Sequence, residues 1–149
     1  MDNKTGNDII GTMEKWYAKA PVLPTNVKEV IVKFAPILAL VFGILGVVGA
    51  IGGLGLLTVF SPLAMLGGAK TISSYGGGFI SALFWLASAV LMLIAYPGIN
   101  ARKQKGWNWL FWSEVVSIVG TLLSYAILSG IVGGLIGFYI LFQVKSYYK

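Results

Sequence analysis

The sequence predicts an all-α integral membrane protein, a bundle of four transmembrane helices preceded by an N-terminal amphipathic interfacial helix. Composition is the first reason: hydrophobic residues make up 57% of the chain and charged residues only 11%, whereas roughly a quarter of an ordinary soluble domain is charged. The second reason is that the apolar residues gather in runs without charge. The longest run extends from Phe34 to Phe60 and is long enough to cross a bilayer as a helix.

Residues 1–25 are expected to form an amphipathic cytoplasmic or interfacial segment, separate from the membrane domain at 26–149. Apolar residues recur here at spacings of three and four, with lysines and Glu14 between them: Ile9, Ile10, Met13, Trp16, Tyr17 and Ala20. This pattern is typical of a helix that lies in the headgroup region with its apolar face toward the membrane. The alternative is a helix docked on the protein's own cytoplasmic surface or on a partner. Proline residues at 21 and 24 then interrupt the helix.

Four spans are expected at about 33–59, 79–96, 107–127 and 131–147. Between the first two spans, residues 61–78 form a mostly apolar connection. A short helix is expected there, beginning at Ser61-Pro62 and ending at Gly67-Gly68, before Gly76 to Gly78 close the loop. Pro97-Gly98 is expected to end the second span, and Ser129-Gly130 to separate the third span from the fourth.

The distribution of basic residues favours four spans and assigns their orientation. With four spans, ten of the eleven Lys and Arg residues lie on one side and only Lys70 lies on the other. The positive-inside rule then predicts a multi-pass protein of the plasma (inner) membrane with both termini in the cytoplasm. Tryptophan is enriched where a membrane meets water, and the expected membrane-interface anchors are Trp16, Trp107, Trp109 and Trp112.

Small residues recur with helical spacing in the first and fourth spans, so that each set lies along one helix face. Such faces allow two backbones to approach closely, either between spans one and four or across a subunit boundary. Packing within one molecule alone is the alternative. The expected packing residues are Ala39, Gly43, Gly46, Ala50 and Gly53 in the first span, and Gly130, Gly133, Gly134 and Gly137, preceded by Ala126, in the fourth.

The third span carries a polar stripe, Glu114, Ser117, Thr121 and Ser124, at steps of three, four and three residues. Burying an ionisable side chain in a membrane costs roughly 3 kcal/mol or more, which makes such a residue a functional candidate. A carboxylate followed by hydroxyls would let a proton or cation enter the membrane. In the alternative interpretation, Glu114 reaches the headgroups or pairs with Lys33, Lys145 or Arg102, and the hydroxyls bond within the helix or to a neighbour.

The residue types present argue against catalysis. The chain has no cysteine, no histidine and only five acidic residues, so neither a catalytic triad nor a metal site can be assembled, and no cofactor is expected. A nucleic-acid partner is not expected either, because the basic residues follow the membrane topology. We therefore expect a small non-enzymatic integral membrane protein that assembles through glycine-rich helix faces with itself or a membrane partner. The alternative function is a small proton-coupled transporter or channel that uses Glu114 and its hydroxyl stripe.

Overall fold

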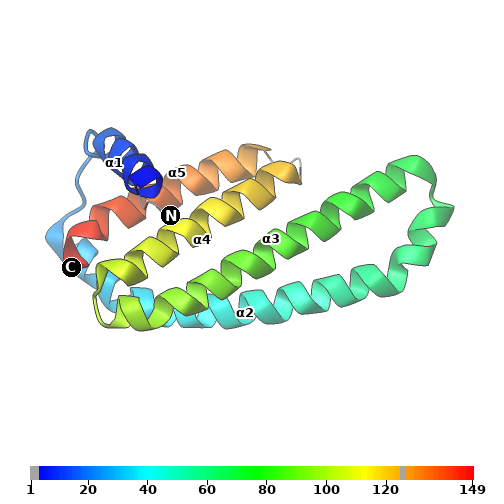
Figure 1. Ribbon diagram of the computed structural model, residues 1–149, viewed down its shortest axis with the longest axis horizontal. Helices are drawn as coiled ribbons and strands as arrows, with labels where there is room; N and C mark the ends of the chain where they lie inside the picture. Colours follow the sequence, from blue (N-terminus) through cyan, green and yellow to red (C-terminus); the bar gives the residue numbers. More distant parts are fainter. Residues whose placement is uncertain (1–3, 125–126) are drawn as a thin grey trace.

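The computed structural model describes residues 4–124 and 127–149, and the regular secondary structure of these ranges is entirely helical. Helices α2 to α5 run antiparallel to their chain neighbours, and α1 lies against α5 near both chain ends (Figure 1). The elements are α1 (Lys4–Tyr17), α2 (Thr25–Leu66), α3 (Gly68–Asn100), α4 (Gln104–Leu123), α5 (Ile127–Val144) and the short 3₁₀ helix η1 (Lys145–Tyr147).

Within the described residues, three helical segments are long and apolar enough to cross a membrane: α2, α3, and the stretch Ile127–Tyr147 formed by α5 and η1. The all-helical fold class is thus confirmed. Helix α4, predicted as the third span, is not among the three. It contains Lys105, Asn108 and Glu114 within twenty residues, and these lower its mean hydropathy.

The prediction of a loop over residues 61–78 is wrong, because almost all of this segment is helical. Helix α2 continues through Pro62 to Leu66, and only Gly67 separates it from α3. Pro62 lacks the N–H that would bond to the Thr58 carbonyl, but the Ser61 hydroxyl donates to that carbonyl at 2.8 Å. The Ser61 hydroxyl therefore replaces the missing backbone donor, and α2 continues through Ser61 instead of a new helix beginning there. Gly68 has a φ of 78°, which glycine adopts without strain, and the chain reverses there.

The other two predicted helix ends are also displaced. Pro97-Gly98 lies inside α3, which runs on to Asn100, and Ser129-Gly130 lies inside α5, which begins at Ile127. The last turn of α3 packs directly on α4, and this contact keeps it helical past the proline. The predicted end of the third span reaches residues 125–126, which lie outside the described residues.

Helices α3 and α4 make a close backbone contact near the turn that joins them. A Cβ atom added at Gly98 would lie only 2.6 Å from the Gly106 Cα atom. Further along, the buried side chains of Ser88 and Ser113 meet, and Gly120 faces the Phe84 side chain. Gly106, Ser113 and Gly120 follow one another at intervals of seven residues, so one face of α4 carries small residues along its length.

The core lies at the end of the bundle that holds both chain termini. Its largest fully buried side chains include Trp107, Phe111 and Ile99. Phe111 contacts the rings of Trp107 and Phe138, with centroids 5.7 Å and 5.2 Å apart. Each such aromatic pair contributes about 0.5–1.5 kcal/mol beyond the burial of its area. The structure thus buries Trp107 completely instead of exposing it as an interface anchor.

The close approach of α3 and α4 makes Gly106 sensitive to substitution. A Cβ added there would collide with the backbone of Gly98 and Ile99, so we expect Gly106→Ala to lower the free energy of unfolding in detergent by about 1–3 kcal/mol. Gly133→Ala is the matched control, because no atom lies within 4 Å of a Cβ at Gly133. Equal unfolding midpoints for the two variants would contradict the close contact.

Candidate functional site

The small-residue face of α2 packs against α3. A Cβ added at Gly43 would lie 2.5 Å from the Leu93 Cδ2 atom, and one added at Gly46 would lie 2.8 Å from the Ala89 Cβ atom. Ala39 and Ala50, on the same face, are also buried. Gly53 differs from these residues because no atom lies within 4 Å of a Cβ built on it. The first part of the predicted face is therefore occupied by a neighbouring helix, and its end is free.

The small-residue face of α5 packs against α4 and does not meet the face of α2. Gly130 faces Thr121, Gly134 faces Ile118, and Gly137 faces the Glu114 carboxyl group. Gly133 points elsewhere and has no neighbour, and Ala126 lies outside the described residues. Each glycine face is thus paired with the helix next to it in the chain, because short turns hold consecutive helices side by side.

Glu114 lies between α4 and α5, where its carboxyl group rests against the backbone at Gly137. Among the ion pairs of residues 4–124 and 127–149, none includes Glu114. The predicted pairing with Lys33, Lys145 or Arg102 is absent from these residues, and Lys145 pairs with Glu14 instead. The sequence singled out Glu114 as an acid inside an apolar segment, and its position against a glycine depends on how α4 and α5 pack.

Two of the three hydroxyl groups that follow Glu114 bond to their own helix. Thr121 donates to the carbonyl of Ser117 at 2.8 Å, and Ser124 donates to the carbonyl of Gly120 at 2.6 Å. These local bonds agree with the alternative interpretation of the stripe. Ser124 also borders a cleft of about 440 Å³ whose other lining residues include Ser73, Ser74 and Ser81 of α3.

A buried polar link between α3 and α4 was not anticipated from the sequence. The Ser88 hydroxyl donates to the Ser113 carbonyl and the Ser113 hydroxyl donates to the Ser88 carbonyl, both at 2.9 Å. Their oxygens lie 3.0 Å apart. The seven-residue spacing of Gly106, Ser113 and Gly120 was a visible signal for this contact face.

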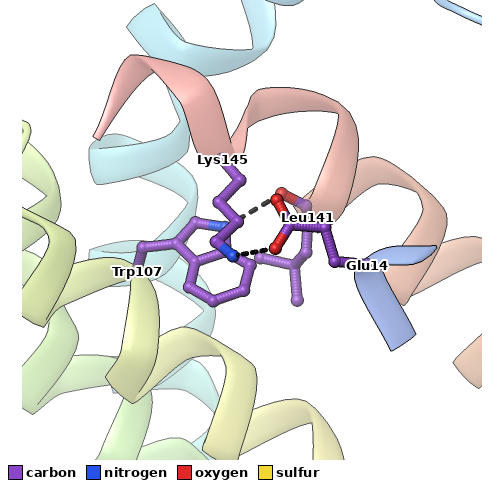
Figure 2. Close-up of polar contacts among 4 residues, drawn as sticks. All are labelled: Glu14, Trp107, Leu141 and Lys145. Atoms are coloured by element: carbon purple, nitrogen blue, oxygen red, sulfur yellow. Dashed lines mark hydrogen bonds and ion pairs between the residues drawn. The ribbon is translucent and has the colours of Figure 1, made fainter. Parts of the chain in front are cut away.

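Lys145 joins three helices at the end of the bundle (Figure 2). Its ammonium group lies 2.5 Å from the Glu14 carboxylate of α1 and 5.3 Å from the centre of the Trp107 ring of α4. Trp107 in turn donates its indole N–H to the Leu141 carbonyl at 2.9 Å. Trp107 is therefore a structural residue that fixes α4 to α5, and the charged pair beside it positions α1.

Helix α1 and the segment after it contact α5, as the docking alternative from the sequence would require. Tyr17 stacks on Phe142 with ring centroids 5.3 Å apart, and Tyr139 donates its hydroxyl to the Pro21 carbonyl at 2.6 Å. Trp16 remains 79% exposed. Of the other predicted anchors, Trp109 and Trp112 are partly buried. Docking on α5 leaves Trp16 free to face a membrane as well.

Comparisons with models of protein families, with curated proteins and with solved structures found no match to this chain. Among residues 4–124 and 127–149, no group of three or more His, Cys, Asp and Glu side chains is placed to hold a metal ion. The helix faces, Glu114 and the docked α1 are thus the features on which a functional proposal can rest.

Substitutions of two neighbouring aromatic residues of α1, Trp16 and Tyr17, can distinguish docking of α1 on the protein from its attachment to the membrane. Tyr17→Ala removes the stack on Phe142, worth about 0.5–1.5 kcal/mol, so we expect hydrogen exchange of the α1 amides to become roughly fivefold faster in detergent micelles and in lipid. Trp16→Ala should leave exchange unchanged, because Trp16 makes little contact with the protein. If only Trp16→Ala accelerates exchange in lipid, α1 is held by the membrane.

Proposed function

We propose that the protein is a multi-pass protein of the plasma membrane with four spans, α2 to α5, and with both termini in the cytoplasm. Helix α4 has 20 residues, about 30 Å at 1.5 Å per residue, which matches the hydrocarbon thickness of a bilayer. The antiparallel order brings the termini and the α3–α4 turn to one end and the α2–α3 turn to the other (Figure 1). Lys70 lies in the first turn of α3, next to the α2–α3 turn. This arrangement of basic residues supports the orientation.

We further propose that the protein is non-enzymatic and assembles with a second copy of itself or a membrane partner through the free end of the α2–α3 hairpin. Helix α2 has 42 residues, about 63 Å in length, whereas α5 has 18, about 27 Å. Beyond the level where Gly49 meets Trp85 and Gly120 meets Phe84, the hairpin extends past the ends of α4 and α5 (Figure 1), and Ser73 and Ser74 share a cleft with Ser124 at the end of α4. This part, residues 51–80, is called the arm below.

The arm presents the combination of small and large apolar residues that packs helices together. No atom of the described residues lies within 4 Å of a Cβ built on Gly52, Gly53 or Gly55, and Leu56 and Val59 beside them are 62% and 71% exposed. Part of the arm extends past a bilayer that α4 and α5 just span, so its apolar surface would meet water unless another helix covers it. This unpaired glycine face at the end of α2 is the observation that carries the proposal.

Single cysteines test the assembly directly, because the natural chain contains none. We expect Gly53→Cys to form an intermolecular disulfide in membranes, at dimer size for self-assembly and at another size for a partner. Ile136→Cys, on an exposed face of α5, is the matched control and should stay monomeric. Absence of any cross-link at Gly53, or equal cross-linking at both positions, would refute assembly through the arm.

One observation favours the alternative function, a proton-coupled transporter or channel. Glu114 has no ion-pair partner among the described residues, and the stripe that it begins ends at Ser124, which borders the serine-lined cleft. An unpaired carboxyl group inside a span is costly and is often retained for proton or cation movement.

For this alternative, we expect pH-driven proton flux into liposomes that contain the protein, and its loss in Glu114→Gln, which keeps the shape but cannot ionise. Val119→Ala is the control for general damage to α4, because Val119 is 39% exposed and lies outside the polar stripe. Flux that is absent, or that survives Glu114→Gln, removes the transporter hypothesis and leaves the assembly hypothesis untouched.

A further inference from the structure

An apolar groove separates α2 from α5 near the chain termini. Trp107 and Leu110 of α4 form part of its lining, and Tyr148 also contributes. The groove also has rim residues open to the surroundings, because Leu38, Phe42 and Ile140 are 48%, 57% and 37% exposed. Its volume is about 170 Å³. In the proposed topology, this groove opens sideways into the cytoplasmic leaflet.

The apolar side chains that line the groove favour a ligand with a hydrocarbon chain. All lining side chains are apolar except for the Trp107 indole N–H and the Tyr148 hydroxyl, and the indole N–H already bonds to Leu141. An apolar cavity of about 150 Å³ stays dry and takes up small apolar ligands. Water is therefore a poor occupant of this groove, and a segment of an acyl chain suits its lining.

One buried hydroxyl in the groove lacks a partner. Tyr148 is only 5% exposed, and its hydroxyl has no hydrogen-bond partner among the described residues. Leaving such a group unpaired costs about 1–3 kcal/mol. Burial raises the pKa of Tyr148, while the positive charge of Arg102 lowers it, so the hydroxyl remains a donor at neutral pH and lies within electrostatic reach of a guanidinium group.

Backbone hydrogen bonds join Lys149 to the turn that carries Arg102. Lys149 donates its backbone N–H to the Arg102 carbonyl at 3.0 Å, and Gln104 donates to the Lys149 carbonyl at 3.1 Å. These bonds hold Tyr148, Lys149 and Arg102 together beside the groove. A ligand with an apolar chain and an anionic head would fit both the groove and its charged end.

We propose that the groove binds one acyl chain of an anionic glycerophospholipid from the cytoplasmic leaflet, with the headgroup at Tyr148 and Arg102. The inference rests on the proposed membrane topology. The lipid would bridge α2 and α5, which make few direct contacts, and would supply the acceptor that the Tyr148 hydroxyl lacks. A zwitterionic lipid can have the same acyl chains but lacks the net negative charge. A preference for the anionic lipid therefore distinguishes binding that involves the headgroup from binding of the acyl chain alone.

Native mass spectrometry of the full chain in detergent, with equal phosphatidylglycerol and phosphatidylcholine of identical acyl chains, measures this preference. We expect one retained lipid and a preference of about fivefold for phosphatidylglycerol, on the scale of one basic side chain at a membrane surface. Arg102 lies in an exposed turn, and Arg102→Gln should bring the ratio of retained phosphatidylglycerol to phosphatidylcholine near one. Ala35→Phe fills the groove and should abolish retention, whereas Val41→Phe, outside the groove lining on the same helix, should not.

The inference is overturned if the natural chain retains no lipid, if it retains both lipids equally, or if Ala35→Phe binds as well as Val41→Phe. Topology is tested separately by an impermeant thiol reagent on spheroplasts. Lys70→Cys should react at once and Lys149→Cys only after permeabilisation. Correct labelling without lipid preference would refute the groove site alone, whereas reversed labelling would refute both the topology and the site.

Discussion

The close contact between α3 and α4 determines how the other helices are arranged. Gly98 and Gly106 allow the two backbones to touch near the turn that joins these helices, and Ser88 and Ser113 exchange hydrogen bonds further along. Helix α2 packs on α3, and α5 packs on α4. Both outer helices therefore depend on the position of this central pair, and the space left between them near the termini is the apolar groove.

The glycines of this protein differ in whether a neighbouring helix covers them. In the part of the bundle where four helices lie together, glycines are covered by neighbouring side chains, as Gly46 is by Ala89 and Gly134 is by Ile118. In the arm, no atom of the described residues lies within 4 Å of a Cβ built on Gly52, Gly53 or Gly55. Lipid tails are as apolar as leucine, so packing and not hydrophobic burial drives the association of helices in a membrane. Uncovered small residues are therefore more informative about assembly than the exposed leucines around them.

The few polar side chains of the bundle mostly have a definite structural task. The Ser61 hydroxyl compensates for Pro62, Trp107 bonds to Leu141, and Lys145 holds α1 through Glu14. Glu114 and Tyr148 stand apart from this group, because neither has a side-chain partner among the described residues. A polar group without a partner is costly in an apolar environment. These two residues are accordingly the ones for which a role outside the fold is proposed.

The sequence by itself determined the helical class, the approximate positions of the helices and the accumulation of basic residues near the termini. Uninterrupted apolar runs and charge placement are properties of the chain alone, and they need no knowledge of neighbours. Only the tertiary structure decided where helices end and which faces meet. Pro62 and Pro97 lie inside helices because a nearby hydroxyl and a packed neighbouring helix outweigh a local breaking signal. Spacing identified the glycine faces, but their partners depend on the order of packing in space. Trp107 was expected at the surface and is wholly buried, because the aromatic rings of α5 and the Leu141 carbonyl surround it only after the bundle has formed.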